Sequence, residues 1–492
     1  MSDFLKKYHI EIIFCLLLVA VAAVSLPNLT TKPRLWYDEG INIEFARNFL
    51  DFGKLDASTA PGEFSGLTRF YQASGYPLSL PLSLFFGIFG FGPAQARIYM
   101  LGWMMIALLS VFIFVRKLAG KETALAASAL IATFASFHDN GRAVMGEIPG
   151  FIFLIWALYW IFWKNSYLAG GLLFGLAISA KPSVYISILP AILVLLILER
   201  KNFLKNGFKI FLGMISPFLL RIWFVMPDIF SLTAWKEVIS LFQNPFGAEI
   251  SPWAYFSGNL ASIPETYTIL YFGLFAAVIL FDYFRRAEKD LVYSKFFIFA
   301  VVYNLFAFLY YLKSPGWLRY LIAADLLTFI LLVIALKNLS LEFFSAGGGS
   351  LPAGRQAPGG KKTLVFHLAV FSLIGFQTYH FFTAAKIFYS NSEEAVISLI
   401  NTEFKNNTIG IFNIPEIGAF VPTDRKYQNY RMMGVPFIGK NPMLYEPAPE
   451  IFILRSGEEI THFAAGEKEI LDNSYKSLRT IGHYTIYRRI SG

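Results

Sequence analysis

The sequence has little charge and almost no cysteine, and both absences narrow the class of protein. Charged residues make up 15% of the 492 residues, whereas hydrophobic residues make up 56%, and the mean hydropathy is +0.53. A soluble chain cannot bury that much apolar surface, so we expect lipid to serve as part of its solvent. Cys15 is the only cysteine, which excludes an intramolecular disulfide and a cysteine-based metal site.

Two further absences concern binding partners. The polar stretch 384–492 lacks a glycine-rich phosphate loop, so it does not read as a nucleotide-binding domain. A net charge of +9 would suggest nucleic acid in a soluble protein, but in a membrane protein basic residues gather in cytoplasmic loops and face anionic lipid. We therefore predict a lipid bilayer as partner and no nucleic acid.

What the chain does contain is a series of long apolar stretches separated by short polar breaks, each typical of a membrane-spanning helix. Lys6 and Lys7 precede the first stretch, and no small-residue cleavage pattern follows it, so we expect a retained anchor. The predicted fold is a mainly α, polytopic helical bundle with eleven spans. These spans are residues 10–27, 97–115, 122–137, 148–163, 166–180, 183–199, 207–226, 265–284, 295–312, 318–336 and 363–383.

The topology depends on one ambiguous apolar segment, residues 76–90, which is short and contains Pro77 and Pro81. If it spans the membrane there are twelve spans, and if it lies in the interface there are eleven. Only the second choice places the short basic loops on the cytoplasmic side with Lys6 and Lys7, as the positive-inside rule requires. These loops contain Arg116, Lys117, Lys121, Lys164, Arg200, Lys201, Lys205, Lys209, Arg285, Arg286, Lys289, Arg355, Lys361 and Lys362. We predict a multi-pass protein of the plasma (inner) membrane.

Composition divides the chain into four parts. Residues 1–340 form a transmembrane domain with long outer loops at 28–96 and 227–264, residues 341–362 a flexible linker, residues 363–383 the last span, and residues 384–492 an extracytoplasmic α/β domain. In the first loop, Ile41, Phe45, Phe49 and Phe52 recur at helical spacing, which predicts an amphipathic helix lying on the membrane. The last part is expected to hold a helix over Ser392–Phe404, capped by Ser392, and strands at Ile409–Phe412, Ile451–Leu454 and Tyr484–Tyr487.

Polar residues that are costly near a membrane cluster at the predicted outer ends of the spans, where a membrane enzyme concentrates its chemistry. They are Asp38, Glu39, Arg97, His138, Asp139, Arg142, Glu147, Lys181, Arg319 and Tyr320. Arginine and lysine hold phosphate and stabilise charge on a leaving phosphate, and a carboxylate accepts the proton of an attacking hydroxyl. This mixture suits sugar transfer from a lipid phosphate, with inversion and an oxocarbenium-like transition state.

At these residues the chain resembles the GT-C superfamily of glycosyltransferases, and within it the protein O-mannosyltransferases and the lipid A aminoarabinose transferases. The resemblance covers roughly residues 36–336 and consists of short motifs in the right order. The motifs are the acidic pair Asp38-Glu39, the run Gly75-Tyr76-Pro77-Leu78, Arg97 at a helix start, Arg142 followed by Glu147, a glycine-rich helix (Gly170, Gly171, Gly175) ending at Lys181, and Arg319-Tyr320. The run at Gly75 departs from the family's His-Pro-Pro-Leu-Tyr segment.

The resemblance implies roles for these residues. Asp38 would be the catalytic base, with Glu39 and Glu147 orienting acceptor or sugar hydroxyls. The donor phosphate would be bound by Arg97, Arg142, Lys181, Arg319 and Tyr320. Further substrate contacts are expected from Tyr37, Tyr76, His138 and Asp139. The implied substrates are a polyprenyl-phosphate-linked sugar and a hydroxyl acceptor on a protein, a lipid or a glycan of the cell envelope.

Other interpretations of the same residues stay open. Arg97 and Lys181 also fit basic residues that snorkel to the interface, and Arg142 with Glu147 fits a structural ion pair. No cofactor is required, although His138 beside Asp139 and Glu147 leaves a divalent metal open. The alternative functions are a transporter or flippase for a lipid-linked sugar, a polysaccharide polymerase or ligase that uses a diphosphate carrier, and an assembly or sensor protein that works through residues 384–492.

Overall fold

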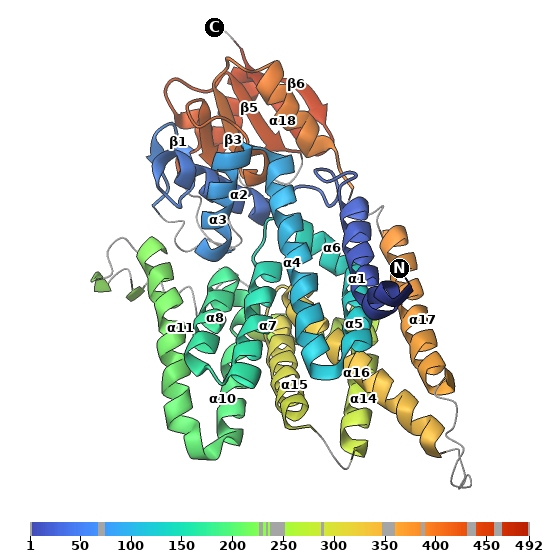
Figure 1. The fold of residues 1–492 in the computed structure, drawn as a ribbon. Helices are drawn as coiled ribbons and strands as arrows, with labels where there is room; N and C mark the ends of the chain where they lie inside the picture. Colours follow the sequence, from blue (N-terminus) through green and yellow to red (C-terminus); the bar gives the residue numbers. More distant parts are fainter. Residues whose placement is uncertain are drawn as a thin grey trace, which may run out of the picture.

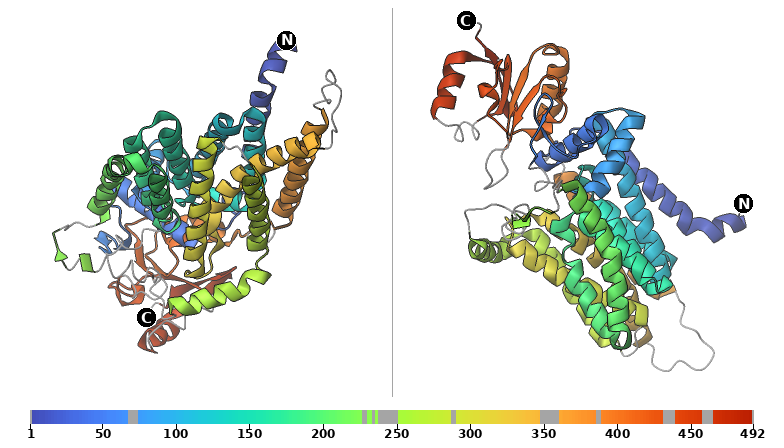
Figure 2. Two further views of the ribbon diagram at one scale, coloured as in Figure 1. Left: turned by 90° about the horizontal axis from the view of Figure 1, so that it is seen from below. Right: turned by 90° about the vertical axis from the view of Figure 1, so that its left-hand side faces the viewer.

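The computed structural model describes residues 2–66, 74–225, 230–232, 235–236, 251–286, 290–346, 360–384, 389–430, 439–456 and 465–490. A helical bundle forms one end of the molecule, and a small mixed sheet with its helices stands at the other (Figure 1). Between them lies the first outer loop, which is folded into helices and a short hairpin. Figure 2 shows that the sheet stands at the end of the bundle and does not run alongside it.

The eleven predicted spans are helical, but residues 122–137, 183–199 and 318–336 each combine two helical elements. Among the described residues, eight helices are long and apolar enough to cross a membrane, and the others are shorter. The bundle consists of α1 (Ser2–Ser25), α4 (Pro93–Ala119), α5 (Lys121–Thr133), α7 (Glu147–Lys164), α8 (Tyr167–Ala180), α9 (Pro182–Tyr185), α10 (Ile188–Leu198), η2 (Arg200–Asn202), α11 (Phe203–Val225), α14 (Tyr267–Arg285), α15 (Leu291–Leu312), α16 (Ile322–Ala346) and α17 (Gly360–Ala384). The predicted fold class, a polytopic helical bundle with a C-terminal α/β domain, is confirmed.

The outer end of the bundle is built from short elements. They are α2 (Tyr37–Phe52), β1 (Ser58–Ala60), β2 (Glu63–Phe64), α3 (Tyr76–Phe89), α6 (Ala135–Arg142), α13 (Pro252–Ser262), η3 (Ile263–Glu265) and η4 (Leu318–Leu321). The ambiguous segment is α3, which lies beside α2 above the bundle (Figure 1). α3 has 14 residues, as does α8 within the bundle, so its length does not decide whether it spans. Its place beside α2 favours eleven spans over twelve.

The C-terminal domain has a five-stranded sheet of order β4-β3-β5-β7-β6, in which β3, β4 and β5 are parallel and β6 and β7 are antiparallel additions. Its elements are α18 (Ser392–Thr402), β3 (Ile409–Phe412), α19 (Pro415–Gly418), β4 (Lys426–Asn429), η5 (Pro442–Leu444), β5 (Ile451–Arg455), α20 (Ala465–Ser474), β6 (Tyr475–Ile481) and β7 (Tyr484–Arg489). The three predicted strands are present as β3, β5 and β7, whereas β4 and β6 were not predicted.

Three boundaries differ from the predictions. α16 continues to Ala346 and α17 begins at Gly360, so the predicted linker is shortened at both ends, and residues 347–359 lie outside the described part. The N-cap of α18 is Asn391 instead of Ser392. The Ser390 hydroxyl accepts a hydrogen bond from the Ser392 amide at 3.2 Å, which explains the shift of the cap. Half of the predicted loop 227–264 also lies outside the described residues; the described half consists of residues 230–232, 235–236 and 251–264, which include α13 and the start of η3.

The prediction that α2 lies on the membrane surface was wrong. Its apolar residues Ile41 and Phe45 are buried in a cluster with Tyr76 and Tyr430, and its polar face is buried too. Arg47 donates through Nη1 to the carbonyl oxygens of Ala419 and Val421, at 2.6 and 2.7 Å. The amphipathic pattern therefore marks a helix that packs against the bundle on one side and the C-terminal domain on the other.

A buried ion pair holds this domain to α2. The Glu44 carboxylate pairs with the Lys426 ammonium, and neither side chain is exposed. Gln428 Nε2 and the Ser58 amide also donate to Glu44, at 3.3 and 3.1 Å. The buried Lys426 side chain of β4 thus has its ion-pair partner, Glu44, more than 380 positions earlier in the chain.

We predict that Glu44→Gln lowers the free energy of unfolding by about 3 kcal/mol, because it leaves the Lys426 charge buried without its partner. Thermal unfolding of the purified protein in detergent, followed by tryptophan fluorescence, measures the loss. Glu403→Gln is the matched control, since Glu403 pairs with Arg479 at 3.8 Å and both side chains are about half exposed. That change should cost less than about 1 kcal/mol. Equal losses in the two variants would contradict the assignment.

Candidate active site

The first charged pair of the site joins α2 to η4. Arg319 Nη2 donates to Asp38 Oδ2 at 2.7 Å, and both side chains are mostly buried. Asp38 lies in the first turn of α2, where a carboxylate is favoured by the helix dipole. The Arg319 guanidinium lies over the rings of Trp317 and Trp36, 4.7 and 5.3 Å from their centroids. Aromatic faces stabilise such a cation and fix its orientation.

The second charged pair joins α7 to the break between α8 and α9. Lys181 Nζ lies 3.6 Å from Glu147 Oε1, and the two side chains are 3% and 0% exposed. Within the described part of the chain, neither Glu147 carboxylate oxygen has a hydrogen-bond partner. Burial lowers the pKa of the Lys181 ammonium, while the charges of Glu147 and Asp38 raise it and that of Arg319 lowers it. The two pairs therefore form one electrostatic cluster, drawn from four separate segments of the chain.

Two glycines bring these segments together around the end of α8. The Gly75 amide donates to the Ala180 carbonyl oxygen at 3.1 Å. A Cβ at Gly75 would collide with the Ser179 carbonyl oxygen, and one at Gly146 with the Ala180 carbonyl oxygen. Residue 75 is where the chain departs from the family's histidine-containing segment, and this packing explains why no side chain fits there.

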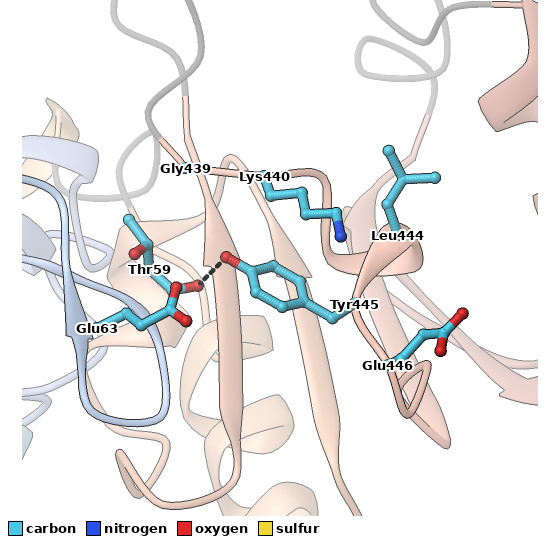
Figure 3. Close-up of a pocket in the computed structure, with 7 residues that line it drawn as sticks. All are labelled: Thr59, Glu63, Gly439, Lys440, Leu444, Tyr445 and Glu446. Carbon is cyan, nitrogen blue, oxygen red and sulfur yellow. Dashed lines mark hydrogen bonds between the residues drawn. The ribbon is translucent and has the colours of Figure 1, made fainter.

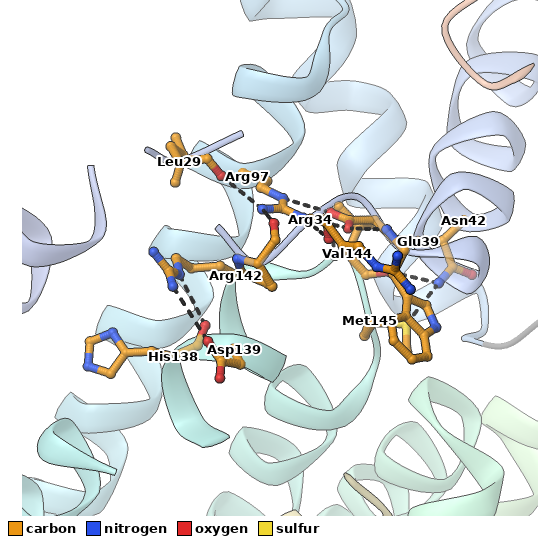
Figure 4. A network of polar contacts seen from close by, with 12 residues as sticks. Leu29, Arg34, Glu39, Asn42, Arg97, His138, Asp139, Arg142, Val144 and Met145 are labelled. Atoms are coloured by element: carbon orange, nitrogen blue, oxygen red, sulfur yellow. Dashed lines mark hydrogen bonds and ion pairs between the residues drawn. The ribbon is translucent and has the colours of Figure 1, made fainter. Parts of the chain in front are cut away.

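Glu39 and Arg97 form the centre of a separate buried network (Figure 4). Arg97 Nε and Nη2 donate to the two Glu39 carboxylate oxygens at 3.0 and 2.7 Å, and neither side chain is exposed. The other Arg97 donors bind the carbonyl oxygens of Leu29, Pro33 and Arg34. Glu39 also accepts hydrogen bonds from the amides of Trp36 and Val144.

This network changes the roles expected for its two members. A guanidinium group has five N–H donors, and the five contacts of Arg97 use all of them. Arg97 has no donor left for a phosphate, and Glu39 has no oxygen turned toward a sugar. The geometry therefore favours structural roles over the phosphate and hydroxyl contacts predicted for them.

His138, Asp139 and Arg142 lie on α6, beside this network. His138 Nε2 is 2.7 Å from the Ala132 carbonyl oxygen, and its Nδ1 is 3.4 Å from the Ser25 hydroxyl. Burial lowers the pKa of His138 to about 4, so the ring is neutral and structural. Among the described residues, no three His, Cys, Asp or Glu side chains are grouped as metal ligands.

The Arg142 guanidinium makes fewer hydrogen bonds to the described residues than the Arg97 guanidinium does. Its Nε donates to the His138 carbonyl oxygen at 3.2 Å, and its Nη2 lies 3.6 Å from Asp139 Oδ1 without a hydrogen bond. The ion pair therefore involves Asp139 and not Glu147, the partner considered from the sequence. Burial raises the pKa of the Asp139 carboxyl, against the charges of Arg142 and Lys32.

The tyrosines predicted as substrate contacts, Tyr37 and Tyr76, have protein partners, and so does Tyr320, which was predicted to bind the donor phosphate. Tyr37 donates to the Asn413 side-chain oxygen at 3.0 Å, and so joins the first turn of α2 to the C-terminal domain. Tyr76 donates to the Pro217 carbonyl oxygen at 3.3 Å. Tyr320 is buried below Arg319, with its ring 5.7 Å from the guanidinium carbon.

Three residues of this region were not predicted. Trp36 and Trp317 hold the Arg319 guanidinium, and Arg221 donates to the Ser179 carbonyl oxygen at 2.7 Å, next to Gly75. The signal that could have identified Arg221 is that it is a charged residue inside an apolar helix. No comparable signal distinguishes the tryptophans from other aromatic residues at the membrane boundary.

Comparison with known proteins bears on the fold. Residues 78–224, which include Arg142, Glu147 and Lys181, match the family described as dolichyl-phosphate-mannose-protein mannosyltransferase. No curated protein matches the sequence. Among solved structures, ArnT from Cupriavidus metallidurans bound to undecaprenyl phosphate is similar over 98% of each chain, with 12% identity and a TM-score of 0.59. The chain has the GT-C fold. The resemblance to that superfamily is thereby confirmed.

A second solved structure shares the architecture. The oligosaccharyltransferase of Archaeoglobus fulgidus, tethered to an acceptor peptide containing the NVT sequon, is similar over 99% of this chain and 75% of its own. The identity is 12% and the TM-score is 0.53. The shared fold therefore includes the C-terminal domain as well as the bundle, and the chain is a multi-pass membrane protein.

We predict that Arg97→Ala lowers the free energy of unfolding by about 3–5 kcal/mol, because it leaves the Glu39 charge buried and unpaired. Thermal unfolding in detergent measures this loss. Arg116→Ala is the control, because Arg116 is half exposed and its nearest carboxylate oxygen, on Glu11, is 3.6 Å away; it should cost less than about 1 kcal/mol. An Arg97→Ala protein as stable as wild type, but with a raised donor KM, would restore the phosphate-binding role.

Proposed function

We propose that the protein transfers a sugar from a polyprenyl-phosphate carrier to a hydroxyl acceptor at the extracytoplasmic face of the plasma (inner) membrane. The observation that carries the proposal is the single cluster of Asp38, Glu147, Lys181 and Arg319. Two carboxylates and two basic side chains, from four segments of the chain, lie together where the bundle reaches the membrane boundary. A lipid-bound donor would present its phosphate at this level.

The two cations suit the donor phosphate. Lys181 supplies a compact ammonium charge, and Arg319 supplies a planar fork whose Nε has no hydrogen-bond partner. When the donor binds, its phosphate accepts hydrogen bonds from the Arg319 guanidinium in place of Asp38. The Asp38 carboxylate is then released from its ion pair. Arg142, whose Nη2 has no hydrogen-bond partner among the described residues, is a further phosphate-binding candidate and lies near the Glu39 network (Figure 4).

Asp38 is then the base of a single displacement. The acceptor oxygen attacks the anomeric carbon as its proton passes to Asp38, and the bond between that carbon and the phosphate oxygen breaks. The electron pair of the broken bond stays on the polyprenyl phosphate, where Lys181 and Arg319 stabilise the charge. Attack opposite the leaving group inverts the anomeric configuration.

Glu147 is suited to binding hydroxyl groups. Its carboxylate is fully buried, and neither oxygen accepts a hydrogen bond from any residue that the structure describes. A buried carboxylate without donors is costly, and two sugar or acceptor hydroxyls would satisfy it. This role fits the one implied by the family resemblance.

The comparisons support a lipid-linked donor. The similar ArnT structure holds undecaprenyl phosphate, and the similar oligosaccharyltransferase holds an acceptor peptide. The basic ends of α4 and α14, and the basic turn η2 that follows α10, lie at the end of the bundle away from the C-terminal domain (Figure 1). By the positive-inside rule, this arrangement supports an extracytoplasmic position for the cluster and the domain.

The alternative functions make different predictions for one assay. Purified protein is supplied with polyprenyl-monophosphate sugars and polyprenyl-diphosphate sugars in turn, and the products are read by mass spectrometry. Transfer from the monophosphate supports the proposal. Transfer from the diphosphate alone would indicate a polymerase or ligase, and movement of the intact lipid across liposomes without transfer would indicate a flippase.

We expect Asp38→Asn to fold normally and to lose at least about 100-fold in kcat, since the amide is nearly isosteric but cannot accept the proton. Initial rates with saturating donor measure the loss. Asp51→Asn is the matched control because Asp51 is exposed near the other end of the same helix, and its rate should match wild type. Near-normal turnover by Asp38→Asn would refute the assignment of the base.

Lys181→Met should weaken binding of polyprenyl phosphate about 10-fold or more, as expected for loss of a charge-assisted contact. Binding is measured by quenching of tryptophan fluorescence. The double variant Lys181→Met with Glu147→Gln removes the buried unpaired carboxylate, so it should recover stability but not affinity. Recovery of affinity in the double variant would show that Lys181 acts only as a structural partner of Glu147.

A further inference from the structure

An open pocket of about 560 Å³ lies away from the charged cluster, between the first outer loop and the C-terminal domain (Figure 3). Thr59 and Glu63 of the β1–β2 hairpin form one wall. The C-terminal domain supplies the rest, from Gly439, Lys440, Leu444, Tyr445 and Glu446. Nothing in the proposed transfer step uses these residues.

The pocket is assembled by direct contact between its two walls. The Tyr445 hydroxyl donates to the Thr59 carbonyl oxygen at 3.3 Å. The Tyr445 ring stacks on Tyr427 of β4, with centroids 4.7 Å apart and an angle of 22° between the planes. A Cβ at Gly439 would lie 2.9 Å from the Thr59 methyl carbon, so the two backbones approach closely there. Tyr445 is thus a positioned aromatic platform.

The chemistry of the walls suits a neutral sugar. Glu63 and Glu446 accept hydrogen bonds, and the Lys440 ammonium, 5.5 Å from the Tyr445 centroid, donates them. Sugar hydroxyls both donate and accept, and the apolar face of a sugar ring packs on an aromatic ring held in place. Two carboxylates against one ammonium disfavour an acidic sugar.

An extended peptide fits this position less well. β4 is the edge strand of the sheet, and β1 packs beside it. A peptide that added to the sheet as a further strand would need that edge. The β1–β2 hairpin covers the β4 edge, and the pocket presents side chains to a ligand.

The pocket does not reach the proposed base. Asp38 lies at the start of α2, and the β1–β2 hairpin folds back beside the middle of that helix, where the Ser58 amide donates to Glu44 at 3.1 Å. Glu44 lies six residues from Asp38, which is about 9 Å along the helix axis, and Thr59 of the pocket follows Ser58 in the hairpin. A ligand that occupied both places would be longer than one sugar unit.

We propose that this pocket binds a neutral sugar unit of an extended glycan acceptor whose reacting end lies at Asp38. The inference rests on the proposed function, which it deepens by naming the acceptor class. The pocket makes longer acceptors bind more tightly, while the cluster around Asp38 performs the transfer.

The test measures binding of neutral manno-, gluco- and galacto-oligosaccharides of two to six units to the full-length protein in detergent, by calorimetry. We expect at least one series to gain about 10-fold in affinity from dimer to hexamer. Tyr445→Ala should abolish this gain, and Glu63→Gln should reduce it. Tyr445→Phe keeps the ring but removes the hydrogen bond to Thr59, and it should retain most of the gain. This variant therefore distinguishes the effect of the ring from that of the hydrogen bond. Asp424→Asn, an exposed change in the same domain, is the control for charge.

The outcomes separate this proposal from the previous one. Asp38→Asn should lose transfer but keep the gain in affinity from dimer to hexamer, because Asp38 does not line the pocket. Length-dependent binding that is equal in wild type and Tyr445→Ala would overturn the inference, as would failure of every hexamer to bind more tightly than its dimer. Pocket-dependent binding of a peptide panel in place of all the oligosaccharides would also overturn it.

Discussion

The ion pair between Arg97 and Glu39 is the contact on which the position of the candidate active site depends. Both side chains are fully buried, and together they join α4, the chain before α2, and the segment that leads into α7. A buried pair of this kind adds little net stability, but it is costly to break. It therefore fixes the register of the first turn of α2. Asp38, the neighbour of Glu39, is thereby held against Arg319.

The C-terminal domain imposes a second constraint on the same helix. Gly40 packs so closely on Pro415 and Glu416 that a Cβ would collide with their backbone. Farther along, Glu44 pairs with Lys426. α2 is thus held from both sides, and the domain takes part in placing the proposed base. Deleting the domain would disturb the site even if none of its residues touched the substrates.

Sequence patterns predicted the elements whose residues are mainly apolar. The spans and strands β3 and β5 are apolar runs, and β7 begins with the mostly apolar run Tyr484–Tyr487, so they were found from sequence alone. β4 was missed because it contains Lys426 and Gln428, which are polar and yet buried. Their partner Glu44 lies in a distant part of the chain, and no local pattern reveals such a pairing. The position of α2 was misjudged for the same reason, since its polar face meets protein and not water.

The sequence by itself determined that the chain spans a membrane, which end of the bundle carries its charged residues, and which of those residues are candidates for chemistry. These properties follow from hydropathy and loop charge, which are local. Only the tertiary structure divided the candidates, assigning Glu39 and Arg97 to a closed network and leaving Glu147 without hydrogen-bond donors. Whether a buried charge is structural or available depends on how many of its hydrogen bonds the protein already satisfies, and those partners come from distant segments.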